Sequence, residues 1–219
     1  MNRLLFEKRG DAVYLSHLDL MRVFQRAFKR ADILIWHSQG FSPRAYVSIA
    51  LPLSVGIESS CELLDFDLDG EPIAEAEIKR RLNEKLVEGV RVLDVYTGGQ
   101  KIKYLALLDC CLTLQYDGGV PEGAAEKITA LLSREEVTVT KKSKSGNTEQ
   151  NIIPMIRKAA VRETNQNTLT VQARICCQNP SLNPMQIVFA IEKYLPECTP
   201  SFVECSRMEI YDQKEQQFR

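Results

Sequence analysis

The amino-acid sequence predicts an α+β fold built from two tandem ferredoxin-like (βαββαβ) units, each with an antiparallel sheet. Strand-like and helix-like hydrophobic periods follow the order strand, helix, two strands, helix, strand in both halves of the chain. Between the halves, residues 97–100 (TGGQ) form a sequence typical of a turn or linker. We therefore expect an N-terminal domain at residues 1–97 and a C-terminal domain at residues 98–219.

The helix that begins at Ser16 is the best defined element of the first half. Asp19 follows Ser16 by three residues, a spacing typical of a helix N-terminus. Leu20, Phe24 and Ala27 then recur at helical spacing and predict one buried face. In this half we expect strands or hairpins at 3–14, 46–53, 61–68 and 90–96, and helices at 16–31 and 73–86.

The second half shows the same order with longer connections. Here we expect strands at 106–116, 137–142, 169–176 and 202–211, and helices at 122–132 and 184–194. The last of these helices opens with Pro184, which is favoured in a first helical turn. Residues 141–150 (KKSKSGNTEQ) are predicted to form a polar loop, 151–160 a short helix, and 212–219 a frayed end.

Composition and charge narrow the class of protein. The chain has 219 residues, of which 44% are hydrophobic and 26% charged, as in a folded soluble protein. Its first ten residues carry charges where a signal peptide has an apolar core, and no run approaches the roughly 18 apolar residues of a membrane span. We expect a cytoplasmic protein without a membrane partner. The seven cysteines, with adjacent pairs at 110–111 and 176–177, do not suggest a disulfide framework.

The net charge of −1 hides an uneven distribution along the chain. Residues 1–50 contain eight Lys/Arg and four Asp/Glu, a balance of +4, whereas residues 51–100 contain five and eleven, a balance of −6. The whole chain is therefore not a generic polyanion binder, but its first fifty residues can present a local positive face.

The segment from Ser16 to Arg44 holds both histidines and the only tryptophan. Its helix carries cationic residues opposite the apolar stripe, and a loop with glycine and proline follows. A basic helix beside a donor-rich loop is typical of an anion-binding site. The candidate ligand-binding residues are Ser16, His17, Asp19, Arg22, Arg26, Arg30, Ser38, Gly40, Phe41 and Arg44.

These residues have expected roles and plainer alternatives. The arginines would contact phosphates, while Ser38 and the backbone amides around Gly40 would donate hydrogen bonds. The alternative for the arginines is a solvated face or a local ion pair. Phe41 either plugs the core or stacks on a base. Ser16 and Asp19 also have the spacing that a helix cap requires.

Three motifs follow one another in the first half: SHLDLMR at 16–22, S-x-G-F-S-P-R at 38–44 and LPLSVG at 51–56. In these motifs the chain resembles the radical-SAM-linked protein family. That bacterial family of uncharacterised function is fused to, or encoded beside, a cobalamin-binding radical SAM protein. The resemblance is strongest over residues 1–95. It implies a radical SAM protein as partner and names no reaction.

Several motifs that cofactor chemistry requires are missing. No two cysteines are separated by two or three residues, so the chain lacks the spacing of a radical SAM iron–sulfur cluster. The two histidines are twenty positions apart and form no paired zinc ligands. The sequence has no Walker loop, no G-x-G-x-x-G and no G-x-S-x-G motif. We therefore expect no metal and no cofactor.

The expected function is non-catalytic recognition of RNA or another phosphate-bearing substrate, as an accessory domain beside the radical SAM partner. One alternative is a metal-independent ribonuclease in which His17 and His37 act as acid and base. Two imidazoles within reach of one phosphate would favour that enzyme, whereas in the binding protein His17 donates to the ligand. A second alternative is a structural module that docks its partner through a sheet edge.

Overall fold

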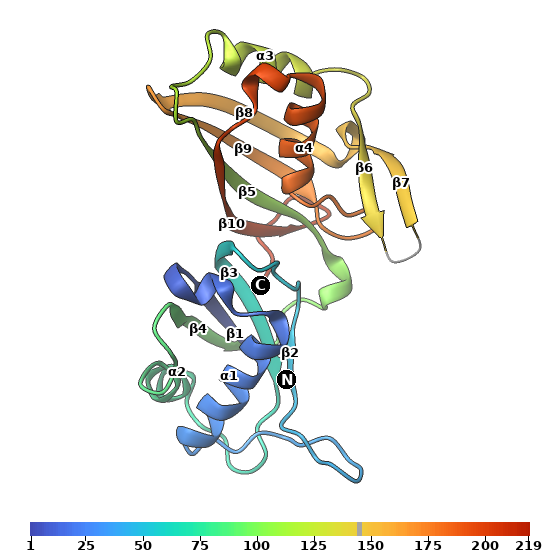
Figure 1. Ribbon diagram of the computed structural model, residues 1–219. Coiled ribbons are helices and arrows are strands. Elements are labelled where there is room, and N and C mark those ends of the chain that lie inside the picture. The colour runs from blue at the N-terminus through green and yellow to red at the C-terminus, as the bar shows by residue number, and fades with distance from the viewer. Residues whose placement is uncertain (144–145) are drawn as a thin grey trace. The chain divides into compact units, whose positions relative to one another are not determined.

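The computed structural model describes residues 1–143 and 146–219 and has a mixed α+β architecture (Figure 1). Among these residues there are four α-helices, and every strand pairing within the two units is antiparallel. The chain divides into two compact units, residues 1–102 together with Arg219, and residues 103–218. In the described part of the chain, no helix is long and apolar enough to cross a membrane.

The first unit contains four strands and two helices in the order βαββαβ. They are β1 (Asn2–Lys8), α1 (His17–Arg30), β2 (Val47–Ile49), β3 (Ile57–Phe66), α2 (Glu75–Asn83) and β4 (Val90–Thr97). The strands pair in the order β4-β1-β3-β2. Two expected strands were too long. The strand at 3–14 ends at Lys8 and a 3₁₀ turn, Gly10–Tyr14, follows it, whereas β2 stops before Pro52, which has no amide hydrogen to donate to a ladder.

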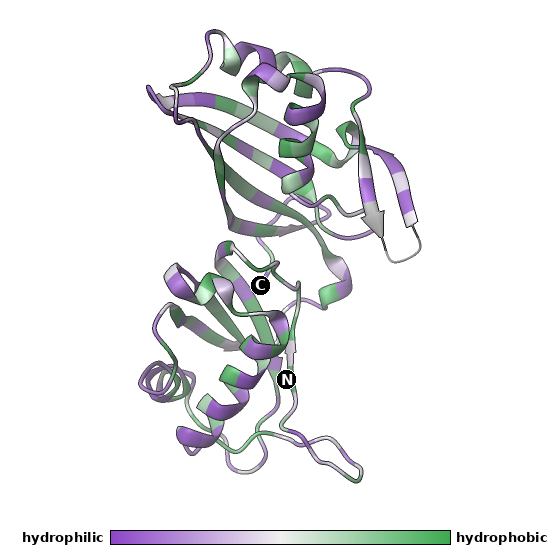
Figure 2. Cartoon of the chain, in the orientation of Figure 1, coloured by the Kyte–Doolittle hydropathy of each residue, from purple (hydrophilic) through white to green (hydrophobic). Residues whose placement is uncertain are grey.

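Two pairs of aromatic rings fix α1 on the sheet. The rings of Phe6 on β1 and Phe24 on α1 lie 4.7 Å apart in an edge-to-face arrangement. Those of Phe28 and Phe66 on β3 lie 4.8 Å apart. All four side chains are buried. Green and purple residues alternate along α1 in Figure 2, as expected for a helix with one buried and one solvated face.

A buried ion pair joins β1 to β3. Arg3 and Asp65 are register partners, and the guanidinium donates to both carboxylate oxygens, at 2.6 and 3.0 Å. Arg3 also donates to the carbonyl oxygen of Gln100 at 2.8 Å. Both side chains of the ion pair are almost inaccessible to water. The bidentate geometry and the additional acceptor satisfy the guanidinium inside the protein.

The second unit repeats this order with one insertion. Its elements are β5 (Leu105–Gln115), α3 (Ala124–Leu132), β6 (Thr138–Ser143), β7 (Gly146–Asn151), β8 (Ile156–Asn165), β9 (Thr168–Cys176), α4 (Met185–Tyr194) and β10 (Phe202–Asp212). Within this unit the main sheet runs β10-β5-β9-β8, and β6 pairs with β7 in a separate two-stranded hairpin. Short 3₁₀ turns lie at Ile102–Tyr104, Ile153–Met155 and Pro196–Cys198.

Three expectations for this half were wrong. The polar loop at 141–150 is instead the hairpin β6–β7, in which Lys141 pairs with Thr148, while residues 144–145 lie outside the described part. The short helix at 151–160 is instead a 3₁₀ turn followed by β8. Most β8 side chains are exposed on both faces, so the sequence shows no strand-like alternation. The expected frayed end is docked, because Phe218 is buried and its amide donates to the carbonyl of Ile210 at 2.9 Å.

The Arg3–Asp65 pair gives a test of the first unit's stability. Asp65→Asn keeps the size of the side chain but removes the buried counter-charge of Arg3, so the free energy of unfolding should fall by about 3–5 kcal/mol. Asp67→Asn is the matched control, because the Asp67 side chain is about half exposed (47%) and pairs with the terminal ammonium group at 3.0 Å. It should cost at most about 1 kcal/mol in urea unfolding. Equal losses for the two variants would contradict this account.

Candidate functional site

The chain that follows α1 turns back on itself as a closed loop. The amide of Ser38 donates to the carbonyl of Arg44 at 2.9 Å, and the amide of Arg44 donates to the Ser38 hydroxyl at 3.1 Å. At the base of the loop, the amide of Tyr46 donates to the carbonyl of Trp36 at 2.8 Å. Gly40 has φ of +135°, a backbone conformation that side-chain-bearing residues rarely adopt. The loop extends away from the first unit's sheet (Figure 1).

A groove of about 670 Å³ lies between α1 and the base of this loop. One hydrogen bond ties its two walls together, from the Gln25 side-chain amide to the carbonyl of Ala45 at 2.8 Å. The groove brings together Arg22 from the helix with Ser38 and Arg44 from the loop. Its full lining is Leu18, Met21, Arg22, Gln25, Ser38, Arg44, Ala45, Tyr46 and Val47.

Two guanidinium groups therefore line the same groove. Arg22 donates one hydrogen bond, at 3.1 Å, to Asp19, and both side chains are more than half exposed. An exposed pair of this kind is weak and leaves the other N–H groups of Arg22 available. Within the described part of the chain, the Arg44 side chain is exposed and has no hydrogen bond or ion pair. The groove is thus positively charged and can accept an anion.

Aromatic side chains surround the groove. Trp36 and Tyr46 form an edge-to-face pair with ring centroids 5.7 Å apart, and they are 41% and 42% exposed. Phe41 is fully exposed in the loop, so the interpretation of this residue as a core plug was wrong. Trp36 and Tyr46 were not among the predicted site residues, although one aromatic residue on each side of a glycine-containing loop was a usable signal.

Ser16 and Asp19 build the start of α1. The amide of Asp19 donates to the Ser16 hydroxyl at 3.2 Å, and that hydroxyl donates to the Asp19 carboxylate at 2.6 Å. This second bond is the main cause that lowers the pKa of Asp19, with the Arg22 guanidinium adding to it. Their contacts are those of a helix cap.

The remaining candidates lie outside the groove lining. His17 is half-buried in the first turn of α1, and Nδ1 of His37 lies 2.8 Å from the carbonyl oxygen of Ile35. Arg26 and Arg30 are exposed on α1, and Arg30 donates to the carbonyl of Lys85 at 2.5 Å. Gly40 and Phe41 belong to the loop beyond the groove. Of the ten predicted residues, the groove brings together Arg22, Ser38 and Arg44.

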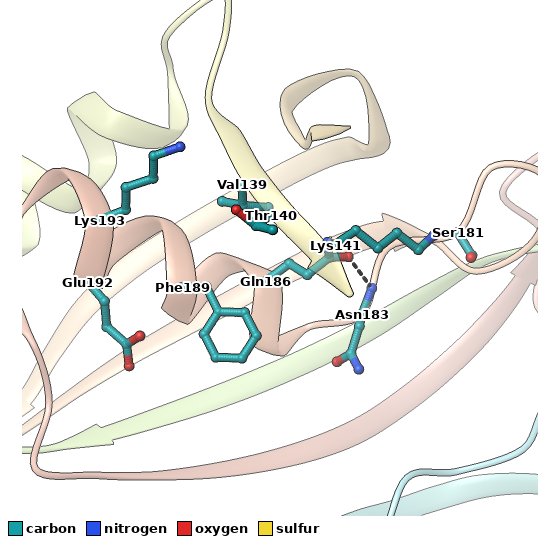
Figure 3. A pocket seen from close by; sticks show the side chains of 9 residues that line it. All are labelled: Val139, Thr140, Lys141, Ser181, Asn183, Gln186, Phe189, Glu192 and Lys193. Atoms are coloured by element: carbon teal, nitrogen blue, oxygen red, sulfur yellow. Dashed lines mark hydrogen bonds between the residues drawn. The ribbon is translucent and has the colours of Figure 1, made fainter. Parts of the chain in front are cut away.

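The second unit has a cavity of about 530 Å³ between β6 and α4 (Figure 3). Its polar groups are largely engaged within the unit. Gln186 accepts a hydrogen bond from the amide of Asn183 at 3.2 Å, and Lys193 donates to the carbonyl of Thr138 at 2.9 Å. Figure 3 shows Lys141 extending toward Ser181. None of the residues that line this cavity was among the predicted site residues. In the described part of the chain, no three His, Cys, Asp or Glu residues are grouped as metal ligands.

The comparisons with known proteins concern the fold and the family. A family model described as "Uncharacterized protein conserved in bacteria (DUF2344)" matches residues 2–184. No curated protein matches the chain. A crystal structure of a Cbf5–Nop10–Gar1 complex is similar, with a TM-score of 0.54 and 9% identity over 95% of this chain and 48% of that chain. A structure of an H/ACA RNP bound to a substrate RNA containing 2′-deoxyuridine has a TM-score of 0.48 and 8% identity over 94% and 46%. This chain spans about half the length of those chains. At 9% identity, the similarity to the Cbf5–Nop10–Gar1 complex establishes a likeness of fold alone.

The cap of α1 gives a second test of stability. Ser16→Ala removes the hydroxyl that accepts from the Asp19 amide, so unfolding should become easier by about 1 kcal/mol. Ser42→Ala changes an exposed serine within the loop and should stay within about 0.5 kcal/mol of the wild type. Thermal and urea unfolding of the three proteins measure the difference. A Ser16 variant as stable as the Ser42 variant would show that the cap contributes nothing.

Proposed function

The chain belongs to the family described as "Uncharacterized protein conserved in bacteria (DUF2344)", and from this premise we propose that it is a non-catalytic recognition protein for single-stranded RNA. The groove between α1 and the loop at 38–44 is the binding site in this proposal. A radical SAM protein is the partner for which the bound RNA is presented. The reaction itself belongs to that partner.

The convergence of Arg22 and Arg44 on one groove carries the proposal. Guanidinium groups bind phosphate through paired N–H donors, and phosphate contacts supply most of the affinity in RNA complexes. The hydroxyl of Ser38 lies in the same groove and adds a hydrogen-bonding group. None of the residues that line the groove is acidic, so an anionic ligand meets no carboxylate in the lining itself.

Exposed aromatic rings favour RNA over a simple anion. Single-stranded RNA is recognised by stacking of unpaired bases on aromatic side chains, and each stacked base contributes about 1–3 kcal/mol. Tyr46 lines the groove, and the ring of Trp36 packs edge-to-face against the ring of Tyr46. Phe41 is fully exposed in the adjoining loop. Phosphate donors and stacking rings therefore lie in the same part of the first unit.

The radical SAM partner rests on the motifs that the chain shares with the radical-SAM-linked family. Two of these motifs, SHLDLMR and S-x-G-F-S-P-R, supply Leu18, Met21, Arg22, Ser38 and Arg44 of the groove. The residues that carry the resemblance are thus also residues that carry the proposed binding. Affinity purification of the tagged native protein, followed by identification of bound protein and RNA, tests the partnership directly.

We also propose that the two units are tandem ferredoxin-like repeats, with the domain boundary between residues 97 and 103. If the strands of each unit are numbered by position, both sheets have the order 4-1-3-2, with β6–β7 as an insertion in the second. Both units also have an arginine–aspartate pair across their first and third strands and a tyrosine on their fourth, although the arginine and the aspartate exchange strands between the units. These residues are Arg3, Asp65 and Tyr96 in the first unit and Arg174, Asp109 and Tyr211 in the second.

The groove can be tested by removing its cations one at a time. Arg22→Ala and Arg44→Ala should each weaken binding of a short single-stranded RNA by about 1–3 kcal/mol, because each removes charge-assisted hydrogen bonds to phosphate. Folding should survive, since Arg22 is exposed and Arg44 closes the loop through its backbone. Fluorescence anisotropy at several salt concentrations measures the affinity, which should fall as salt rises.

Arg26→Ala and Arg30→Ala are matched controls for charge, because both residues lie on the same helix but outside the groove. They should weaken binding less than the two groove variants. RNA that binds equally well to the wild type and to a folded protein lacking both Arg22 and Arg44 would show that the groove is only a solvated surface. Equal effects of all four substitutions would indicate a diffuse positive field.

The absence of catalysis by this chain alone has its own test. Burial raises the pKa of Cys177 and Cys205 to about 12, so these thiols hold their protons at neutral pH. Burial likewise raises the pKa of Cys110. Cluster assembly needs closely spaced thiolates, so the purified protein should be colourless and free of stoichiometric iron. Iron analysis and absorbance spectra after anaerobic reconstitution provide the measurement. One iron–sulfur cluster per chain would overturn this part of the proposal.

A further inference from the structure

The second unit has a sheet face that its helices leave uncovered. In Figure 1, α3 and α4 lie on the same side of the sheet formed by β8, β9, β5 and β10. Side chains alternate between the two faces along a strand. Leu169 and Val171 on β9 are fully buried beneath the helices, so Thr170 and Gln172 belong to the opposite face. Their register partners on β8 are Arg162 and Ala160.

A hollow of about 370 Å³ lies in this open face. Among the residues that line it, Ala160 lies on the open face as the register partner of Gln172, and its small side chain leaves space there. The charged and polar groups that line it are Asp109, Lys158, Gln172 and Arg174, with Cys110 and Met208 completing the wall.

We infer that this hollow is a second binding site for single-stranded RNA, with the nucleotide over Ala160 and Gln172 and its phosphates toward β8. The inference rests on the proposed function only in taking RNA as the ligand. It uses a different unit and a different set of residues from the groove beside α1.

The cations on β8 flank the hollow. Lys158 and Arg162 stand on either side of Ala160, and their register partners, Arg174 and Thr170, put both on the open face. They are four positions apart on the strand, about 13 Å, which leaves room for a nucleotide between two bound phosphates. Both side chains are exposed, and in the described part of the chain neither forms a hydrogen bond or an ion pair. Arg162 can therefore bind phosphate, and Lys158, which also interacts electrostatically with Asp109, can do so beside that carboxylate.

Arg174 forms a rigid wall of the hollow. Its guanidinium donates to Asp109 at 2.7 and 2.8 Å and to Glu215 at 2.7 Å. It also lies 3.7 Å from the ring centre of Tyr211, whose hydroxyl donates to Asp109 at 2.9 Å. These contacts use three of the five N–H donors of Arg174 and place two carboxylates beside its charge. The phosphate-binding role consequently falls to Lys158 and Arg162.

Gln172 supplies the chemistry that can recognise a base. It is exposed, and in the described part of the chain its amide makes no hydrogen bond, so its donor and its acceptor can both bind a ligand. A side-chain amide can pair with the hydrogen-bonding edge of an unpaired base. Two exposed apolar residues of β10 adjoin this surface: Met208 lines the hollow and is 52% exposed, and Phe202, whose register partner Gln115 lies on the open face, is 59% exposed. They offer apolar surface to a base.

An acidic peptide is a less suitable occupant. An extended peptide gains most of its affinity by pairing its backbone with a free strand edge. Such pairing would use the outer edge of β8 and would not engage Gln172 or the hollow. The arrangement of the Gln172 amide, the small Ala160 and two cations on one face favours a nucleotide.

The test uses the full-length protein and a short fluorescein-labelled oligouridine, with binding followed by anisotropy at several salt concentrations. Replacing both Lys158 and Arg162 by alanine should weaken binding about tenfold and make the slope of log affinity against log salt shallower by about 0.7 for each lost phosphate contact. The control is Lys127→Ala with Arg134→Ala, which removes the same charge from the helical side of the unit. This control should change the affinity less than about twofold.

Two further variants separate a site from a general positive field. Gln172→Ala should weaken binding about three- to fivefold without changing the salt slope, because no charge is lost. Ala160→Ile fills the hollow with a side chain suited to a strand and should also weaken binding without changing the slope. Circular dichroism and unfolding curves establish that each variant is folded. Unchanged affinity in the Gln172 and Ala160 variants overturns the inference.

The two proposals can fail separately. If Arg22→Ala and Arg44→Ala weaken binding while the β8 variants do not, the groove stands and the second site is wrong. If only the β8 and Gln172 variants weaken binding, the second site stands and the groove proposal fails. A fluorescein-labelled polyglutamate peptide is the competing probe. Loss of peptide binding, but not of RNA binding, in the β8 double variant would assign this face to an acidic protein and overturn the inference.

Discussion

The aromatic packing of α1 against the sheet is the constraint on which the proposed groove depends. Phe24 and Phe28 are one helical turn apart, and each meets a phenylalanine of a different strand. Two anchors on one helix fix both its position and its rotation about its axis. The rotation decides which residues face water, and so it directs Arg22 toward the loop. A substitution at Phe24 would thus affect the groove although it contacts no ligand.

The groove itself combines a rigid wall with a self-closing loop. The helix is held by its core contacts, whereas the loop at 38–44 is held by hydrogen bonds of its own backbone and of Ser38. Gln25 connects the two walls, because its amide lies on the helix and its acceptor, Ala45, lies at the base of the loop. Cationic side chains on both walls can therefore be replaced without removing the bonds that define the groove.

The sequence predicted those parts in which local pattern and tertiary structure agree. The cap at Ser16 and the apolar stripe of α1 combine capping chemistry with helical periodicity, and the structure has both. The prediction failed for β8, whose exposed side chains lack alternation, and for the tail, where burial of the single residue Phe218 outweighs polar surroundings. At the site, residue types indicated Arg22, Ser38 and Arg44. These three residues converge, and Gln25 and Tyr46 join them, only because the loop folds against α1. The spacing of the residues along the sequence does not predict that arrangement.

The two arginine–aspartate pairs differ in the order in which the arginine and the aspartate occur along the chain. In the first unit the arginine precedes the aspartate, on β1 and β3, whereas in the second unit the aspartate comes first, on β5 and β9. Two units with the same strand order can exchange strands while they fold, a known failure of repeated domains. An exchange here would place Arg3 opposite Arg174, or Asp65 opposite Asp109, and would bury like charges together at a cost of several kcal/mol. The reversed order of arginine and aspartate in the two units therefore disfavours the pairing of a strand from one unit with a strand of the other.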